Sequence, residues 1–213
     1  TNDMNHQPTD LQLRFQKDIH PYRVSSKQEA LWWNEIVQHY GKPKRAYHNL
    51  DHLTVLFHWA DRYQALLADP EIVYWAIWYH DIIYQARRRD NEEQSALLAE
   101  NRLTEIGLTP AKITEVAAYI RATSQHLNVE ATGDLAFFLD FDLAILGAPA
   151  QEYKQYAAAV RQEYQHVPGF LYRRGRKKVL RYFLDAPRLY RTEVMYELLE
   201  KPAKENLRQE LGL

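Results

Sequence analysis

The residues with the clearest chemical potential are an adjacent histidine and aspartate, His80 and Asp81, which follow the apolar residues 75–79. This segment predicts a helix that is apolar on all sides, and such a helix is normally buried. A buried imidazole or carboxylate is costly unless it finds a partner, and one divalent metal ion can serve both groups. The alternative that the pair leaves open is a core histidine bonded to a neighbouring carboxylate.

Two more groups of potential ligands lie on either side of this pair. His48 and His52 are four residues apart, so at helical spacing they share one face. Asp140 and Asp142 lie in a second apolar segment. Because they are two residues apart, their side chains point about 200° from each other, and only one of them can face a given site. The spacing alone does not show which histidine or which aspartate would bind a metal ion.

The amino-acid composition excludes several kinds of functional site. The chain has 213 residues, a net charge of -1 and no cysteine, which excludes disulfides, thiolate zinc sites and a cysteine nucleophile. Any metal must therefore be held by His, Asp and Glu. With only 7 glycines and no glycine-rich phosphate loop, the chain does not fit a Rossmann or P-loop protein. The balanced charge gives no global attraction to nucleic acid or to an anionic membrane.

The sequence gives no sign of export or membrane insertion. Residues 1–10 are polar and lack the apolar stretch of a signal peptide. No apolar run reaches transmembrane length, because His, Asp or Arg interrupts the longest candidates. Together with the absence of cysteine, these features predict a cytoplasmic location without a membrane partner.

Apolar periodicity, caps and breaks predict helices along the whole chain, and no segment shows sustained strand alternation. Caps are expected at Ser25 or Ser26 with Glu29, at Asp69 and around Gly107 and Thr109. We expect one all-α domain over residues 1–213, with a motif core at 45–147 and helices of 150–213 packed on it. The expected helices cover residues 11–19, 26–41, 49–67, 70–84, 92–106, 110–124, 134–146, 150–166, 170–184, 192–199 and 203–211.

The order of the candidate ligands resembles the HD superfamily of metal-dependent phosphohydrolases, and in particular its branch of small bacterial proteins. The resemblance covers residues 45–147 well and the region around Gly175 and Arg176 more loosely. It is carried by Arg45-x-Tyr47-His48-Asn49-x-x-His52, Tyr79-His80-Asp81-x-x-Tyr84, Asn91-Glu92-x-x-Ser95-Ala96 and Asp140-x-Asp142-Leu143-x-x-Leu146-Gly147.

The resemblance implies a compact bundle of helices around a divalent ion, which could be Mn, Fe, Co, Ni, Zn or Mg. The implied ligands are His52, His80, Asp81 and Asp142. Asp142 is preferred to Asp140 because the last aspartate of the family is typically followed by leucine. His48 and His126 are auxiliary candidates, as ligands or phosphate-facing groups, although His126 could also be a surface histidine at a helix end.

The implied activity is hydrolysis of a small phosphate ester, with a nucleotide among the candidates, by a metal-activated water. Asp81 is expected to bind the metal and accept a proton, Arg45 to offset phosphoryl charge, and Glu92 to orient the water or a ligand. Arg87, Arg88 and Arg89 could rim the site. Tyr84 occupies the position where several HD nucleotidases have an acidic residue, so the general acid is unassigned.

Three other functions remain open at this stage. A sensor module would bind nucleotide and metal without turnover, and a di-iron oxygenase would need additional histidine ligands such as His48 and His126. Binding of nucleic acid through the basic residues 173–178 is disfavoured by the balanced charge of the chain. Dimerisation through the aromatic helices is also open.

Overall fold

The computed structural model describes residues 9–213, and every regular element within that range is a helix. The expectation of an all-α protein is therefore confirmed for this part of the chain. Residues 1–8, which belong to the segment predicted to lack a signal peptide, lie outside the described residues. The α-helices are α1 (Asp10–Ile19), α2 (Ser26–Tyr40), α3 (Leu50–Arg62), α4 (Pro70–Tyr79), α5 (Asn91–Ile106), α6 (Pro110–Ala122), α7 (Gly133–Asp142), α8 (Ala150–Glu163), α9 (Gly169–Asp185) and α10 (Glu193–Leu211). Short 3-10 turns are η1 (His20–Tyr22), η2 (Gln64–Leu66), η3 (Thr123–Gln125) and η4 (Ala144–Gly147).

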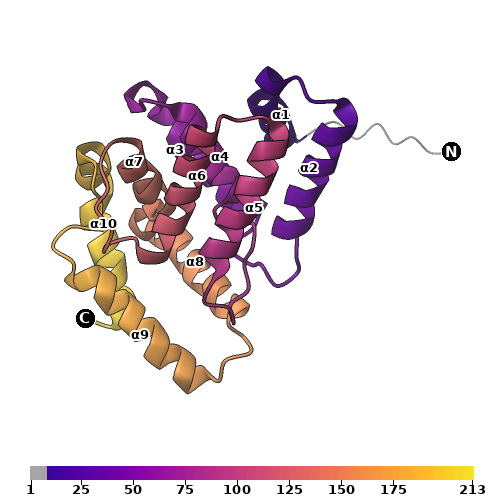
Figure 1. Ribbon diagram of the computed structural model, residues 1–213. Coiled ribbons are helices and arrows are strands. Elements are labelled where there is room, and N and C mark those ends of the chain that lie inside the picture. The colour runs from indigo at the N-terminus through magenta and orange to yellow at the C-terminus, as the bar shows by residue number, and fades with distance from the viewer. Residues whose placement is uncertain (1–8) are drawn as a thin grey trace.

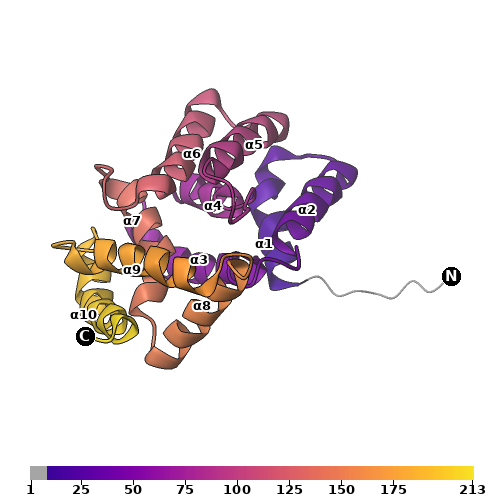
Figure 2. The same cartoon turned by 90° about the horizontal axis from the view of Figure 1, so that it is seen from below.

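Helix α4 lies inside the bundle, in contact with α3, α5, α6 and α7 (Figures 1 and 2). Its side chains are buried on every side, as the apolar sequence predicts, and Trp75, Trp78 and Tyr79 are fully buried. The Trp78 ring packs edge-on against Phe15 of α1 and Trp33 of α2, with centroids 5.5 and 6.2 Å apart. This packing fixes the position of the C-terminal end of α4.

Most of the expected helix caps are present. Gly107 ends α5 with a φ of 105°, and the Thr109 hydroxyl accepts a hydrogen bond at the start of α6, as predicted. Ser25 caps α2, but Gln28 completes the capping box in place of the expected Glu29. Because the helix begins at residue 26, the third helical position is that of Gln28.

The two ends of α4 differ from the prediction. Asp69 precedes the helix, but its carboxylate pairs with Lys112 Nζ at 2.9 Å and caps no backbone N–H group. The helix ends at Tyr79, whereas the prediction extended it further. His80 and Asp81 therefore lie in the turn that follows, where they leave the helix and are free to face a neighbouring element.

The two helices predicted near the C-terminus form one continuous helix, α10, with Pro202 inside it. The prediction divided it there because proline removes a backbone donor. Buried residues such as Leu199 and Leu207 recur on both sides of the proline, and α10 packs on η4 along this face. Gly147 permits the close approach, since a Cβ atom there would lie 2.7 Å from Leu199 Cβ.

Helix α9 crosses the lower end of the bundle in Figure 1, and in Figure 2 it lies in front of α3 and α8. Leu180 is its one buried residue. Leu171 and Val179 are 47% and 45% exposed, although both are apolar. α9 is thus a sparsely packed helix that lies over the bundle and contributes Leu180 to its core.

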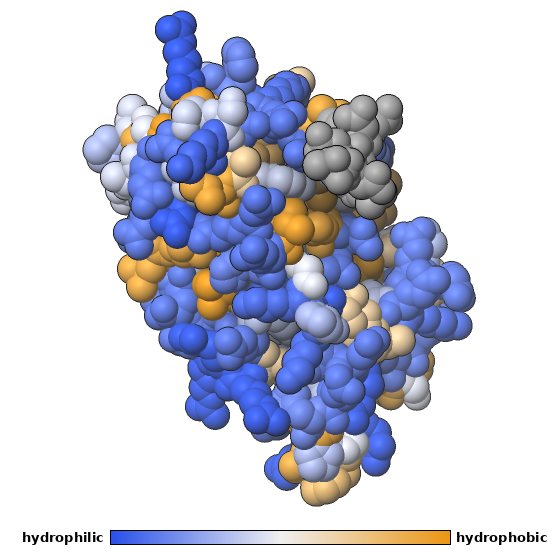
Figure 3. Space-filling view, turned by 90° about the vertical axis from the view of Figure 1, so that its right-hand side faces the viewer, coloured by the Kyte–Doolittle hydropathy of each residue, from blue (hydrophilic) through white to orange (hydrophobic). Residues whose placement is uncertain are grey.

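No helix between residues 9 and 213 is both long enough and apolar enough to cross a membrane. Figure 3 shows the face on the side of α1 and α2, where hydrophilic residues predominate and hydrophobic ones form small separate patches. Such scattered apolar patches are ordinary for the surface of a globular protein.

Two glycine substitutions test the packing of α10 and α9. Gly147→Ala should lower the free energy of unfolding by about 1–3 kcal/mol, because the added methyl group over-packs the contact with Leu199. Gly175→Ala in α9 is the matched control, since its Cβ atom would meet nothing within 4 Å. It should raise the stability by about 0.5–1 kcal/mol, as alanine favours helix. Urea unfolding followed by circular dichroism measures both, and equal changes would contradict the close approach at Gly147.

Candidate metal centre

Three helix ends position the predicted ligands. His52 lies in the first turn of α3, where Asn49 Oδ1 accepts hydrogen bonds from two backbone N–H groups at 3.0 and 3.3 Å. His80 and Asp81 follow the C-terminal end of α4, and Asp142 is the last residue of α7. Because α3, α4 and α7 pack against one another, these ends meet.

The four predicted ligands lie close together. Nε2 of His52 and Nε2 of His80 are 3.1 Å apart. Asp81 Oδ2 is 3.2 Å from the His80 nitrogen and 3.7 Å from the His52 nitrogen. Asp142 Oδ1 is 3.3 Å from His52 Nε2 and 3.6 Å from His80 Nε2. His52, His80 and Asp81 form a mutually close set, and Asp142 joins it through both imidazoles.

These separations suit ligands around a small cation. Donor atoms about 2.1 Å from a first-row ion lie about 3.0 Å apart in an octahedron and about 3.4 Å apart in a tetrahedron. The side chains of His52 and His80 are 2% and 1% exposed, whereas those of Asp81 and Asp142 are 15% and 13% exposed. The imidazoles therefore form the floor of a site that the carboxylates open to solvent, and this donor set could hold a divalent ion.

The protonation of His80 is set by a backbone contact. Its Nδ1 lies 2.9 Å from the carbonyl oxygen of Ile77 in the last turn of α4. A carbonyl oxygen only accepts hydrogen bonds, so Nδ1 carries the proton. In the neutral ring, Nε2 then presents its lone pair to His52, Asp81 and Asp142. A histidine bound to a metal typically has its other ring nitrogen held in this way.

The imidazoles and carboxylates of the cluster shift one another's pKa values, because they are close together and buried. Burial opposes the charged form of His80, yet Asp81 and Asp142 outweigh it and raise its pKa well above 6.5. Burial dominates at His52 and lowers its pKa. Burial would raise the pKa values of both carboxylates, but the neighbouring imidazoles hold them low. A proton on His80 therefore balances the carboxylates in the metal-free protein, and a divalent ion would replace it.

His126 and His48 lie at the edge of the cluster, one beside each carboxylate. His126 Nε2 is 2.6 Å from Asp142 Oδ2, and this direct hydrogen bond leaves no room for an ion between the two. His48 Nε2 is 4.0 Å from Asp81 Oδ2. Of the two histidines four residues apart, His52 is the one that contacts the other ligands.

Glu163, the last residue of α8, is a site residue that sequence reasoning missed. It accepts hydrogen bonds from the backbone N–H groups of Tyr47 and His48 at 2.8 and 3.0 Å, and from the Tyr84 hydroxyl at 2.9 Å. Its Oε2 also lies 2.7 Å from His48 Nδ1, so Nε2 of that ring is left to face Asp81. It lies 115 residues from His48, and no motif or spacing connects the two.

Arg45 bonds to the backbone beside the candidate ligands, and its expected contact with phosphate stays a prediction. The residue is 6% exposed. Its NH1 group donates to the carbonyl oxygens of His48 at 3.2 Å and Asp81 at 2.7 Å, and its NH2 group donates to that of Ile82 at 2.7 Å. The guanidinium therefore fixes the turn that carries Asp81, and Arg45 also lines a cavity beside this turn.

Asp140 supports a helix and does not contact the imidazoles. Its carboxylate accepts hydrogen bonds from Arg191 N at 2.8 Å and from both the backbone N and the hydroxyl of Thr192 at 2.7 Å. Asp140 is fully buried, and it holds the segment that leads into α10. The two carboxylates of this segment thus have separate roles, as their opposite directions imply.

The Glu92 side chain forms no hydrogen bond or ion pair within residues 9–213, and its expected role in orienting the water or a ligand stays a prediction. The supporting contacts come from its neighbours on α5. The Asn91 side chain bonds to the backbone N and O of Gln85 at 3.1 and 3.0 Å. Ser95 Oγ bonds to the backbone N and O of Ile83 at 3.1 and 3.2 Å. These two residues hold the loop that follows the ligand turn.

Comparisons with known proteins add no independent identification. No protein-family model, no curated protein and no solved structure matches the chain. The case for a function therefore rests on the residues and contacts described above.

The two aspartates of α7 should respond differently to the same substitution. Asp142→Asn should weaken Mn²⁺ binding at least about tenfold, because it removes a charged ligand. Asp140→Asn should leave Mn²⁺ affinity unchanged but lower the stability by about 1–3 kcal/mol, since it weakens buried hydrogen bonds. Isothermal titration and urea unfolding measure the two effects. A larger loss of affinity in Asp140→Asn would contradict the assignment.

Metal binding should weaken as the pH falls. The raised pKa of His80 means that its proton persists above pH 6.5 in the metal-free protein. Each ion that binds must displace that proton, so the apparent Kd should rise by about tenfold per pH unit below the raised pKa and level off above it. Titrations with Mn²⁺ in two buffers of different ionisation enthalpy would show the released proton. An affinity independent of pH would be the contrary result.

Proposed function

We propose that the protein is a metal-dependent phosphohydrolase that acts on a small phosphate ester, as its resemblance to the HD superfamily implies. The observation that supports this most is the convergence of His52, His80, Asp81 and Asp142 from three helix ends, with His80 in the tautomer that suits a ligand. A divalent ion held there would supply a water of lowered pKa and offset charge on a phosphoryl group.

Asp81 is the group in position to take a proton from an attacking water. Its Oδ2 faces the imidazoles of His52 and His80. The other carboxylate oxygen, Oδ1, accepts no hydrogen bond from any residue between 9 and 213. Asp81 can therefore both help to hold the cation and accept a proton at Oδ1.

His48 is a further group that could contact the substrate, because its imidazole lies beside Asp81. Burial opposes the charged form of His48, but Asp81 and Glu163 outweigh it and raise the pKa of the imidazole. Its Nδ1 is bonded to Glu163, so Nε2 is the atom that can donate to a phosphoryl or leaving-group oxygen. We therefore include His48 and Glu163 in the proposed catalytic machinery.

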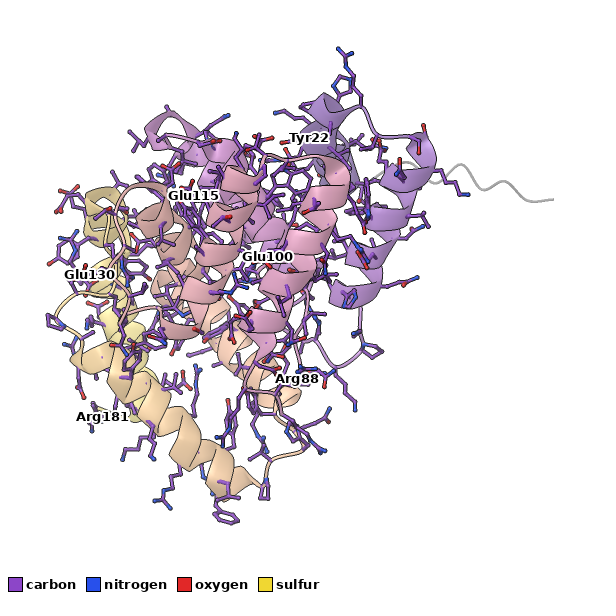
Figure 4. All side chains as sticks on the ribbon, viewed as in Figure 1. Tyr22, Arg88, Glu100, Glu115, Glu130 and Arg181 are labelled. Carbon is purple, nitrogen blue, oxygen red and sulfur yellow. The ribbon has the colours of Figure 1, made fainter. Side chains whose placement is uncertain are left out.

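An anionic substrate is supported by the basic residues around a neighbouring cavity. This cavity has a volume of about 720 Å³, lies beside Tyr84 and is lined by Lys42, Lys44 and Arg87, among other residues. Arg88, which is labelled in Figure 4, pairs with Asp90 instead. Positive charge beside a metal centre attracts phosphate esters, and a nucleotide is one such ester.

The direct test is hydrolysis of p-nitrophenyl phosphate with added Mn²⁺, before and after chelation. The double variant His80→Ala, Asp81→Ala should lose at least about a hundredfold in kcat/KM, because it removes two ligands. His58→Ala, an exposed histidine of the helix that carries His52, is the control and should retain full activity. Full metal-dependent turnover by the double variant would rule out the proposed site.

The same preparations distinguish the alternative functions. Tight nucleotide binding without product release would indicate a sensor module. Two irons per chain together with oxygen uptake would indicate a di-iron oxygenase, which the direct bond between His126 and Asp142 does not favour.

A further inference from the structure

A second cavity, of about 460 Å³, lies on the other side of Tyr84 from the basic one, between α8 and α9. Its most frequent lining residue is tyrosine, and small-molecule sites in proteins have volumes in this range. The rings belong to Tyr47, Tyr84, Tyr156, Tyr164 and Tyr172.

This tyrosine cavity shares two neighbouring residues with the candidate metal centre, although none of the four candidate ligands lines it. His48 lines it, and Nε2 of that residue is 4.0 Å from Asp81 Oδ2. Tyr47 also lines it, and its ring centroid is 4.9 Å from that of His52. A group bound in the cavity would therefore be adjacent to a phosphoryl group at the metal centre.

The groups in the cavity lining that can carry charge already have partners, and His48 is bonded to Glu163. The guanidinium of Arg176 is the other charged group in its lining. Its Nε and NH2 atoms donate to Glu210 at 2.8 and 2.9 Å, and its side chain is 10% exposed. Since the charge of Arg176 is already neutralised, a second charged group in the cavity would be left without a partner. The occupant should therefore be uncharged.

The rings lie at angles to one another, 70° between Tyr47 and Tyr156 and 45° between Tyr164 and Tyr172. Tyr47 and Tyr156 pack with centroids 4.7 Å apart, and the guanidinium carbon of Arg176 lies 5.3 Å from the Tyr156 centroid. Aromatic side chains of this kind offer faces and edges to another ring, and such contacts add to the free energy of burying the ring. The geometry suits a planar group better than a flexible chain.

Helix α9 forms the outer wall of the cavity, and Figure 2 shows it crossing in front of α3. Tyr172, Gly175, Arg176 and Val179 line the cavity and lie on one face of α9. The opposite face is basic and exposed, and Arg181 is labelled there in Figure 4. Gly175 stands in the middle of the inner face, and a Cβ atom there would meet nothing within 4 Å. The glycine leaves room for an occupant.

We propose that the tyrosine cavity binds the alcohol part of the phosphate ester and selects alcohols that are uncharged and carry a planar ring. This inference rests on the proposed hydrolase function. It assigns the phosphoryl group to the metal centre, beside Asp81 and His48, and the leaving alcohol to the cavity under α9. A nucleoside and a simple aryl alcohol share the required chemistry.

The test compares benzyl phosphate with ethyl phosphate, whose alcohols have similar acidity but differ in the ring. The wild-type protein with Mn²⁺ should favour the benzyl ester in kcat/KM by about tenfold or more. Gly175→Trp fills the cavity from α9 and should abolish this preference. Val179→Trp, on the same face, should do the same if the first variant does not fold. Lys177→Trp, on the exposed face, carries the same new side chain outside the cavity and should retain the preference.

A second comparison, of kcat/KM for adenosine 5′-phosphate and ribose 5-phosphate, extends the test to a nucleobase. A preference for the adenosine ester would identify the nucleoside as the occupant. Equal rates for benzyl and ethyl phosphate in the wild-type protein, or a benzyl preference that survives both tryptophan variants, would overturn the inference. If no ester is hydrolysed, the proposed function fails. Calorimetry with benzylphosphonate and ethylphosphonate then tests the cavity without turnover. Tighter binding of the benzyl compound to the wild-type protein but not to Gly175→Trp would support the cavity's role, and equal binding of both compounds to the wild-type protein would overturn it.

Discussion

The candidate site depends on a single hydrogen bond in the last turn of α4, between His80 Nδ1 and the carbonyl oxygen of Ile77. It fixes the proton on the side of the ring away from His52, Asp81 and Asp142. Without it, two buried imidazole nitrogens 3.1 Å apart could exchange roles as donor and acceptor. With it, Nε2 of His80 faces two carboxylates and a second imidazole, and a proton on this nitrogen offsets carboxylate charge when no metal is bound. A divalent cation would replace that proton without burying an unpaired charge.

The charged residues around the ligands act mainly on the backbone. Arg45 donates to three carbonyl oxygens at the two turns that carry His48 and Asp81. Glu163 accepts two backbone N–H groups at the first of these turns, and Asp140 does the same at the start of α10. Each buried charge is thus stabilised by several charge-assisted hydrogen bonds. The result is a rigid frame in which the ligand side chains have little freedom, as a preorganised metal site requires.

The helical fold could be predicted because its signals are local. Gly107, Thr109 and the apolar period of each segment are readable from a few neighbouring residues. The end of α4 could not be predicted, since the apolar pattern continues past Tyr79. The role of Arg45 could not be predicted either, because a basic residue before a histidine motif looks the same whether its guanidinium reaches a substrate or a carbonyl oxygen. Glu163 depends on a contact across 115 residues, which no local pattern encodes. The four candidate ligands could be predicted as a set because their order and their apolar surroundings both resemble those of a known family.

The most direct test is a crystal structure of the protein grown with Mn²⁺, with anomalous scattering used to locate the ion. The account predicts one strong anomalous peak within coordination distance of His52 Nε2, His80 Nε2, Asp81 and Asp142. A peak bound elsewhere, or no peak between these side chains at a saturating concentration of Mn²⁺, would contradict the claim that they converge to hold a cation.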